Sequence, residues 1–342
     1  MKAAVFYGPN QPLKLEEVDT PTPKPGEILV KVAACGVCHT DLHYIDHGVP
    51  TFKKPPMILG HECSGTVAQL GEGVDSFKKG DKVLLPAVLT CGVCDFCRTG
   101  RENICEKMVM FGNHVDGAYA EYVIAPAKDV FTLPDEIPLE EGSIIADAIS
   151  TPFHAVKNRG EVRPGDTVVV FGCGGIGVNI VQVAAAAGGT VIAVDISEAK
   201  LEWARKLGAT YTVNPSKVEK LGKEIRKLTG GGADVAFEAI GKPETIQSAF
   251  GTLRKGGRLV VVGYSAEDIR LSAARIMFFE MEVVGSLGCR PVDYPKLIEM
   301  ARVGKIKVAE LVTHKLPLSE INEALEMLRR GDESVLRSVV IP

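Results

Sequence analysis

"VVVFGCGGIGVNIVQVAAAAGGTVIAVD" (residues 168–195) contains the pattern G-x-G-x-x-G as Gly172, Gly174 and Gly177. The pattern follows an apolar run typical of a buried strand and opens an Ala/Val-rich stretch typical of a helix. A second apolar run then ends at Asp195. All parts of a dinucleotide-binding fingerprint are therefore present in order. A glycine-rich structural turn is the alternative, and the full context makes it the weaker interpretation.

Each part of this fingerprint has a physical role. The first glycine permits a tight turn, the second lets the backbone approach a pyrophosphate, and the third lets the helix pack on the strand. The helix N-terminus supplies amide donors to phosphate groups. Asp195 would accept hydrogen bonds from both ribose hydroxyls and repel a 2′-phosphate, which favours NAD over NADP. Lys200 either assists at the ribose or is a solvated helix residue. The candidate coenzyme-binding residues of the turn are Gly172, Gly174, Gly175, Ile176 and Gly177.

The whole chain divides into three segments that differ in their pattern of expected strands and helices. A length of 342 residues is more than one core usually organises. Residues 1–150 are rich in short β-type runs separated by Pro and Gly, which suits an antiparallel, barrel-like domain. Residues 151–290 alternate strands with helices, which predicts a parallel, doubly wound sheet. Residues 291–342 contain two amphipathic helices and a last strand, "SVVIP", that we expect to return to the first domain.

Composition and charge exclude several classes of function. A net charge of −4 gives no broad electrostatic case for binding nucleic acid or anionic membranes. The N-terminus lacks the long apolar core of a secretory signal. The most apolar stretch is interrupted by glycines, Asn179 and Gln182, so it is poorly suited to crossing a bilayer. We expect a cytoplasmic protein.

Nine cysteines in such a chain indicate metal or thiol chemistry rather than disulfides. Four of them lie close together in "CGVCDFCRTGRENIC" (91–105). Four thiolates at this density can complete a tetrahedral shell around a structural Zn²⁺. A redox CxxC is the competing interpretation, but it leaves two cysteines unexplained. The four cysteines are Cys91, Cys94, Cys97 and Cys105.

Three other stretches contain candidate metal ligands. "CGVCHTDLH" (35–43) and "GHECSG" (60–65) offer thiol, imidazole and carboxylate groups. Spacing alone does not select a ligand set, because Cys35 and Cys38 would also suit a redox pair and a His beside a Glu would suit a structural role. The third stretch, "SIIADAISTPF" (143–153), is an apolar, helix-like run with Asp147 in its middle. A buried carboxylate needs a cation, hydrogen-bond donors or a metal as its partner.

Taken together, "GVCHTD", "GHE", the four-cysteine lobe and "GCGGIG" followed by "AVD" resemble the zinc-containing medium-chain alcohol dehydrogenases. The resemblance covers essentially the whole chain, and the motifs occur in the order found in the family. It implies an α/β protein with a GroES-like β-rich catalytic domain and a Rossmann domain with a doubly wound parallel sheet. The active site is expected in the cleft between the two domains, in a homo-dimer or homo-tetramer.

The resemblance also implies a catalytic zinc site. It places Cys38 and His61 on the zinc, with Glu62 beside them as an outer group or exchangeable ligand. Many members have a cysteine as the third ligand in a segment resembling "CAGVTT", and here Asp147 occupies that position. Cys⁻, neutral His and Asp⁻ around Zn²⁺ sum to zero charge, as two thiolates and one His do. The alternative is that Glu62 ligates and Asp147 lies outside the shell.

Further roles follow from the same resemblance. Thr40 would bind the substrate hydroxyl and pass its proton, by way of the coenzyme ribose, to His43. Asp41 would orient His61. Zinc would lower the pKa of the alcohol, and the alkoxide would deliver hydride to NAD⁺. The expected cofactors are NAD and two zinc ions, one catalytic and one structural. The remaining expected coenzyme contacts are His39 and Arg337 at the phosphates, and Thr151 and Ile176 at the nicotinamide.

The substrate is predicted to be a secondary, cyclic alcohol. "GVCHTDL", the segment around Asp147 and "MFGNHVDGAYAEY" (110–122) together resemble 6-hydroxycyclohex-1-ene-1-carbonyl-CoA dehydrogenases. Lys53 and Lys54 would then meet CoA phosphates, or they are solvated loop residues. Three alternatives stay open. They are a simple secondary-alcohol or polyol dehydrogenase, a zinc-free quinone or enoyl reductase, and a non-enzymatic NAD-binding protein.

Overall fold

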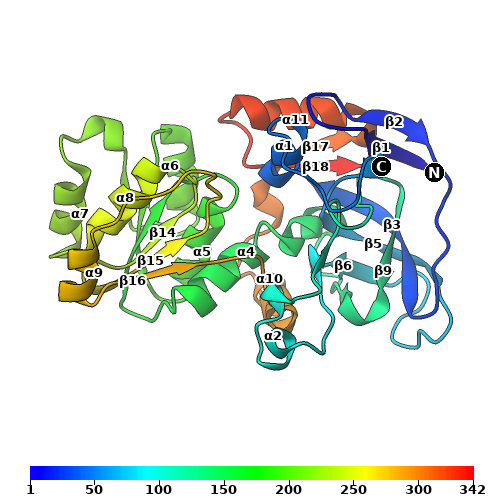
Figure 1. Ribbon diagram of the computed structural model, residues 1–342, viewed down its shortest axis with the longest axis horizontal. Helices are drawn as coiled ribbons and strands as arrows, with labels where there is room; N and C mark the ends of the chain where they lie inside the picture. The colour runs from blue at the N-terminus through cyan, green and yellow to red at the C-terminus, as the bar shows by residue number, and fades with distance from the viewer. The chain divides into compact units, whose positions relative to one another are not determined.

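The computed structural model describes residues 1–342, which form two compact units (Figure 1). Unit 1 combines Met1–Asp147 with Gly288–Pro342, and unit 2 is the continuous segment Ala148–Leu287. The sequence predicts boundaries after residues 150 and 290, and the structure has them after 147 and 287.

Unit 1 is built on a curved sheet with the strand order β10-β6-β5-β3-β18-β17, in which β9 also pairs with β3. All of these pairings are antiparallel except that of β17 with β18. The strands are β3 (Glu27–Gly36), β5 (Glu62–Leu70), β6 (Lys82–Leu85), β9 (Tyr122–Pro126), β10 (Phe131–Thr132), β17 (Val312–Pro317) and β18 (Arg337–Ile341). A second sheet contains β1 (Lys2–Phe6), β2 (Lys14–Glu17) and β4 (Met57–Ile58). A third sheet contains β7 (Val88–Leu89) and β8 (Val109–Met110).

The pairing of β3 with β5 brings two of the ligand-rich stretches together. Gly36 at the end of β3 lies opposite Glu62 at the start of β5, and Cys35 lies opposite Cys63. Most residues of these two strands are buried on both faces, and Ile28, Val30 and Val32 of β3 point into one apolar core. The last strand, β18, pairs with the same end of β3. Three segments far apart in sequence therefore meet at one end of this sheet.

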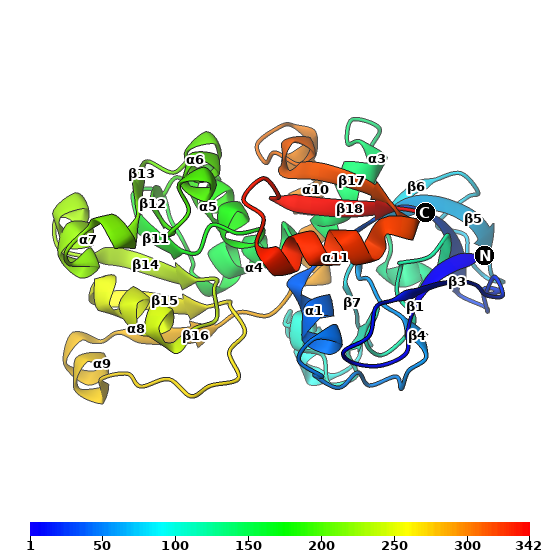
Figure 2. The same cartoon turned by 90° about the horizontal axis from the view of Figure 1, so that it is seen from above.

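The helices of unit 1 are short and lie around this sheet (Figures 1 and 2). Helix α11 contacts α1, β17 and β18, so the C-terminal segment is part of unit 1. The α-helices are α1 (His39–Ile45), α2 (Asp95–Arg98), α3 (Leu139–Gly142), α10 (Tyr294–Arg302) and α11 (Ile321–Arg330). Single 3₁₀ turns span Glu102–Ile104, Ala127–Asp129, Ser143–Ala146, Pro291–Asp293, Ala309–Leu311 and Leu318–Glu320.

Unit 2 has the predicted parallel, doubly wound sheet, with the strand order β13-β12-β11-β14-β15-β16. The order reverses at β11, so right-handed crossovers place the helices that follow β11 and β12 on one face and the helices that follow β14 and β15 on the other. Figure 2 shows α5 and α6 on one side and α8 on the other. The strands are β11 (Thr167–Phe171), β12 (Thr190–Val194), β13 (Tyr211–Val213), β14 (Ala233–Glu238), β15 (Leu253–Val261) and β16 (Glu282–Gly285). The helices are α4 (Ser150–His154), continued by a π-turn (Ala155–Arg159), α5 (Gly177–Ala186), α6 (Glu198–Lys206), α7 (Leu221–Thr229), α8 (Pro243–Thr252) and α9 (Ala273–Phe279), with a 3₁₀ turn at Pro215–Lys217.

The segment 143–153 differs from the continuous helix-like run expected from its apolar pattern. A 3₁₀ turn spans Ser143–Ala146, and the backbone then leaves helical geometry at Asp147, with φ −141° and ψ −54°. Helix α4 begins only at Ser150. The expectation of a continuous run is wrong because the chain passes from unit 1 to unit 2 after Asp147.

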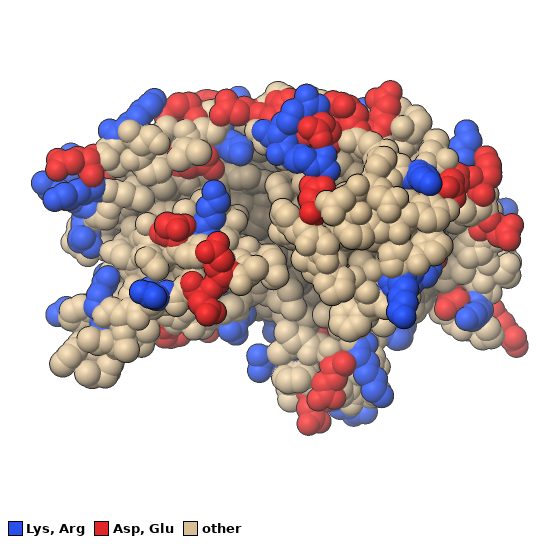
Figure 3. Space-filling view, turned by 45° about the horizontal axis from the view of Figure 1, so that its top comes forward, with Lys and Arg blue, Asp and Glu red and all other residues tan.

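No helix in the structure combines the length and the apolar character needed to cross a lipid bilayer. On the face drawn in Figure 3, acidic and basic side chains are interspersed over both units. This surface agrees with the small net charge of the chain.

Candidate functional site

Four potential metal ligands gather in unit 1, at the end of the sheet where β3, β5 and β18 meet. Cys38, His61, Glu62 and Asp147 each offer a ligand atom, and these atoms all lie within 4.8 Å of one another. Cys38 precedes α1, His61 directly precedes β5, Glu62 begins β5, and Asp147 follows the 3₁₀ turn. The structure therefore brings together the three ligands expected from the resemblance and the alternative ligand Glu62.

The distances between these atoms fit a tetrahedral zinc ion. Asp147 Oδ2 lies 3.9 Å from Cys38 Sγ and 3.7 Å from His61 Nε2. Bonds of 2.0–2.3 Å at tetrahedral angles place ligand atoms about 3.3–3.8 Å apart. His61 is 1% exposed, and neither of its ring nitrogens has a hydrogen-bond partner. A buried imidazole without partners is costly, and a metal on Nε2 would remove that cost, so the residues present fit zinc.

Glu62 is held differently from Asp147. Its Oε1 accepts a hydrogen bond from Arg337 Nη2 in a buried ion pair, and its Oε2 has no hydrogen-bond partner. Burial raises the pKa of Glu62, and Arg337 opposes that rise. One oxygen of Glu62 is engaged by Arg337 and the other has no partner, whereas Asp147 faces both Cys38 and His61. Asp147 as the third ligand, with Glu62 as the alternative, stays a prediction.

Arg337 is a buried side chain of unit 1, 5% exposed and paired with Glu62. The sequence predicts a contact between Arg337 and the coenzyme phosphates, and that contact stays a prediction. The guanidinium has a structural role that the sequence did not indicate, because Glu62 and Arg337 lie 275 positions apart.

The start of α1 places the other residues of "CGVCHTDLH". Cys38 is extended, and its backbone N–H donates to Asp41 Oδ2 at 3.3 Å in a capping box, which begins the helix at His39. Thr40 Oγ1 consequently lies 3.6 Å from Cys38 Sγ. Asp41 Oδ1 lies 3.7 Å from His61 Nδ1. His39 lies in the first turn of the same helix.

His43 lies one turn further along α1. Its Nδ1 lies 3.2 Å from Nδ1 of the exposed His47. Burial lowers the pKa of His43, and the charge of a protonated His47 lowers it further. Both effects favour the neutral imidazole of His43. Sequence reasoning missed His47, although its spacing of i, i+4 from His43 was the available signal.

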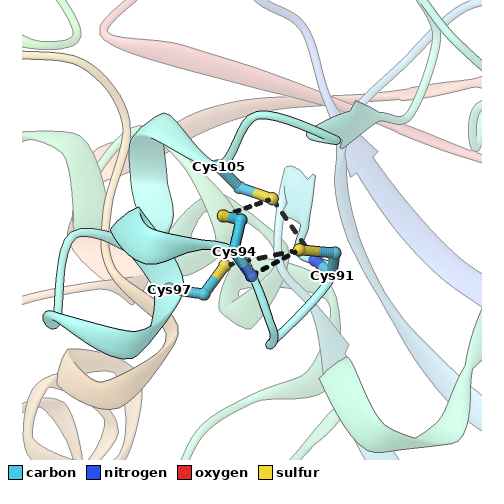
Figure 4. A group of neighbouring side chains, drawn as sticks. All are labelled: Cys91, Cys94, Cys97 and Cys105. Atoms are coloured by element: carbon cyan, nitrogen blue, oxygen red, sulfur yellow. Dashed lines mark hydrogen bonds between the residues drawn. The ribbon is translucent and has the colours of Figure 1, made fainter.

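The four cysteines of residues 91–105 form a second cluster (Figure 4). Cys91 Sγ lies 3.9 Å from Cys97 Sγ, and Cys94 Sγ lies 3.8 Å from Cys105 Sγ. Four sulfurs at Zn–S bonds of about 2.3 Å stand about 3.8 Å apart, whereas a disulfide brings them to about 2.05 Å. The geometry therefore fits a closed Cys₄ zinc shell, and none of these cysteines is in a disulfide.

Backbone amides point at the sulfurs of this cluster. Cys91 Sγ accepts from the N–H groups of Val93 and Cys94 at 3.5 and 3.3 Å, and these bonds lower the pKa of Cys91 to about 6. Cys105 Sγ accepts from the N–H of Lys107 at 3.3 Å. At Cys91 and Cys105 these donors favour the thiolate, which is the form that binds zinc.

The fingerprint in unit 2 has the geometry expected of a dinucleotide site. Gly172 has φ +88°, a value that favours glycine, and a side chain at Gly177 would collide with the carbonyl oxygen of Gly172. A Cβ added at Gly174 meets nothing within 4 Å, so the backbone is open there to an approaching ligand. Ile176 is the N-cap of α5, and the Gly175 carbonyl accepts from Asn179 Nδ2 at 2.7 Å.

Asp195 lies directly after β12 at the carboxyl edge of the parallel sheet. Its Oδ2 accepts from the Cys173 N–H at 2.7 Å, and its Oδ1 accepts from the Ser197 N–H at 2.9 Å. Both bonds fix the carboxylate beside the glycine turn. Lys200 is a half-buried residue of α6, and Thr151 lies in α4.

Comparisons with known proteins agree with this arrangement. Residues 24–135 match the alcohol dehydrogenase GroES-like domain, and residues 175–302 match the zinc-binding dehydrogenase domain. An alcohol dehydrogenase of Geobacillus stearothermophilus is 37% identical over 332 residues, with 97% of each chain covered. The chain belongs to the zinc-binding medium-chain alcohol dehydrogenases.

Other members of this dehydrogenase family are similar over the whole chain. A sorbitol dehydrogenase of Bacillus subtilis is 36% identical, covering 100% of this chain and 97% of its own. The crystal structure of 2R,3R-butanediol dehydrogenase from Bacillus subtilis superposes with a TM-score of 0.92 at 31% identity, covering 100% of this chain and 99% of its own. The GroES-like and Rossmann fold class expected from the sequence is confirmed, and the chain is an alcohol dehydrogenase by family.

One further residue of this dehydrogenase was missed as part of the site. The sequence indicated only a β-type run at "AYAEYVIAP", whereas the hydroxyl of Tyr119 reaches Asp41. Burial and the charge of Asp41 raise the pKa of Tyr119 well above its usual value, so the hydroxyl is a donor. No local pattern signalled this contact, because it joins residues 78 positions apart.

Proposed function

We propose that the chain oxidises a secondary alcohol to a ketone, with zinc as Lewis acid and NAD as hydride acceptor. The set formed by the buried Cys38 and His61 with the half-buried Asp147 is the observation that carries this proposal. A thiolate, an imidazole and a carboxylate leave the fourth position of a tetrahedral zinc open, which distinguishes a catalytic site from a closed structural one. Asp147 is 18% exposed, whereas His61 is 1% exposed, so access to the site is on the side of Asp147.

Zinc bound to these residues would lower the pKa of an alcohol hydroxyl. The chain's own residues would hold and move the proton. Thr40 Oγ1, which lies 3.6 Å from Cys38 Sγ, would accept the hydroxyl proton and pass it, by way of the coenzyme ribose, to the imidazole of His43. Asp41 would fix the orientation of His61 through its Nδ1 side. Cys91, Cys94, Cys97 and Cys105 would hold a second zinc that stabilises the loop and takes no part in the chemistry.

The preference for NAD over NADP rests on Asp195. Replacing Asp195 with alanine should shift the ratio of kcat/KM for NAD to that for NADP by about 10–100-fold toward NADP, because two charge-assisted hydrogen bonds to the ribose are lost and a repulsion is removed. Steady-state kinetics with both coenzymes measures the ratio. Asp195→Asn removes the charge and keeps only one of the two acceptors, because Cys173 and Ser197 donate to different oxygens of Asp195. An unchanged ratio in Asp195→Ala would contradict the ribose role.

For the substrate, we propose a ring hydroxyl on an acyl-CoA, with simple secondary alcohols and polyols as the second candidate. The segment around Asp147 supports the first candidate. Lys53 is less available to CoA than its sequence suggests, because its Nζ lies 2.5 Å from Asp116 Oδ2. The sorbitol and butanediol dehydrogenases among the similar proteins support the second candidate.

A substrate panel tests the function and separates the candidates. The zinc-loaded protein with NAD⁺ should reduce the coenzyme with secondary alcohols in preference to primary ones, measured as absorbance of NADH. The panel contains 6-hydroxycyclohex-1-ene-1-carbonyl-CoA, cyclohexanol, 2,3-butanediol, sorbitol and ethanol. A kcat/KM for the CoA thioester at least tenfold above that for cyclohexanol supports the acyl-CoA assignment, and the reverse order rejects it. No NADH from any alcohol would overturn the proposed activity.

A further inference from the structure

Asp41 lies behind the proposed ligand His61, and Tyr119 lies behind Asp41. Tyr119 is fully buried. Its hydroxyl lies 2.7 Å from Asp41 Oδ2 and 3.3 Å from the Gly36 carbonyl oxygen. A phenol has one proton to donate, and the shorter distance to a carboxylate assigns that proton to Asp41.

Asp41 connects this hydroxyl to the ligand. The carboxylate is fully buried, and its two oxygens have different surroundings. Oδ2 accepts from the Tyr119 hydroxyl and from the Cys38 N–H, whereas Oδ1 has no hydrogen-bond partner and lies 3.7 Å from His61 Nδ1. Two donors on one oxygen fix the rotation of the carboxylate, so Oδ1 is directed at the imidazole.

The orientation of the Asp41 carboxylate matters because Nδ1 of His61 must carry a proton while Nε2 offers its lone pair to the metal. Nδ1 and Nε2 are both buried and without hydrogen-bond partners. A proton on Nδ1, attracted by Asp41 Oδ1, leaves the lone pair of Nε2 facing Asp147 Oδ2 at 3.7 Å. Carboxylates behind ligand histidines fix the tautomer and raise the basicity of the metal-binding nitrogen.

The ring of Tyr119 is placed by the same backbone that carries His61. The Tyr119 N–H donates to the Leu59 carbonyl at 3.0 Å, and the Ala118 N–H donates to the Gly60 carbonyl at 2.9 Å. A Cβ at Gly60 would lie 2.8 Å from Tyr119 Cδ1, so the ring packs directly against the residue before His61. The ring of Tyr119 therefore contacts Gly60 while its hydroxyl bonds to Asp41, and a substitution that removes only the hydroxyl separates the two contacts.

We infer that the Tyr119 hydroxyl is a positioning group that sets His61 for zinc by holding Asp41. The inference rests on the proposed metal site of Cys38, His61 and Asp147. Tyr119→Phe removes the hydroxyl oxygen and keeps the ring packed against Gly60, so we expect the backbone of the site to stay unchanged.

Zinc release from the purified holoenzyme tests the inference. Excess chelator with a colorimetric zinc indicator should resolve two zinc ions in the wild type. In Tyr119→Phe, the affinity of one of them should fall about tenfold, at the lower end of the effect of removing an outer partner of a ligand histidine. The zinc of the four-cysteine cluster should keep its affinity and serves as the reference within the same molecule. With Co²⁺ in the weaker site, the visible absorption of the metal should also shift.

Two further variants make the result specific. Tyr7→Phe also removes a tyrosine hydroxyl that donates to a carboxylate, Glu16 Oε2 at 2.8 Å, and it should leave both zinc affinities unchanged. Asp41→Asn should weaken the same zinc, and adding Tyr119→Phe to it should have little further effect, because the link is already broken. Full additivity would assign the effect to packing and overturn the inference, as would wild-type affinity and absorption in Tyr119→Phe. If the wild type itself releases only one zinc, the proposed catalytic site fails instead.

Discussion

Replacing Asp147 with alanine should remove one of two zinc ions per chain and lower kcat/KM by about a thousandfold or more. Without Asp147, a zinc ion would keep only Cys38 and His61 from the proposed set, and the lost carboxylate leaves the charge of the site unbalanced. Loss of the metal removes the Lewis acid, whose contribution to the barrier is several kcal/mol. Metal analysis of the purified protein and steady-state kinetics measure the two effects.

Two other variants separate the proposed ligand from its alternative. Asp147→Cys restores an anionic ligand and should keep two zinc ions, with the metal held at a longer bond. Glu62→Gln should also keep two, because Glu62 is engaged by Arg337 on one oxygen. A count of two in Asp147→Ala would reject Asp147 as a ligand, and a count of one in Glu62→Gln would transfer the role to Glu62.

Replacing Arg337 with methionine should reduce the free energy of unfolding by about 3–5 kcal/mol, because Glu62 is then a buried carboxylate without its cation. The side chains of Arg337 and Glu62 are 5% and 0% exposed, so water cannot replace the lost partner. Urea unfolding followed by far-UV circular dichroism measures the loss. The double variant Glu62→Gln, Arg337→Met should recover part of it, since no buried charge is then left unpaired.

A second arginine of unit 1 provides the matched control. Arg329 donates two hydrogen bonds to Asp46, at 2.8 and 2.9 Å, but its side chain is 40% exposed. Arg329→Met should cost no more than about 1 kcal/mol, because solvent screens and replaces the interaction. Equal losses in Arg329→Met and Arg337→Met would show that burial does not set the contribution of the Glu62–Arg337 pair.

The sequence predicted those parts of the molecule that depend on local spacing. The strand, glycine turn, helix and Asp195 of the fingerprint lie within 28 consecutive residues, and the four cysteines lie within 15, so their patterns were visible without the fold. The alternation of strands and helices predicted the parallel sheet for the same reason. The family resemblance, rather than spacing, selected Cys38, His61 and Asp147 from a larger group of possible ligands.

Contacts between distant residues were beyond sequence reasoning. The Glu62–Arg337 ion pair depends on β18 pairing beside β3, and the contact of Tyr119 with Asp41 depends on the backbone pairing of 117–119 with 58–60. The irregular backbone at Asp147 was also missed, because its apolar neighbours suit a helix by periodicity and are buried by tertiary packing instead. In each case tertiary structure determined the outcome.

The discontinuity of unit 1 has a consequence for the order in which the protein matures during synthesis. Unit 2 is one uninterrupted segment and is complete when residue 287 has been made. Unit 1 needs β18, and Glu62 receives its counter-ion only when Arg337 has left the ribosome. A nascent chain can therefore fold its nucleotide-binding half first, while the metal-binding half keeps an unneutralised carboxylate beside its ligands until Arg337 has emerged.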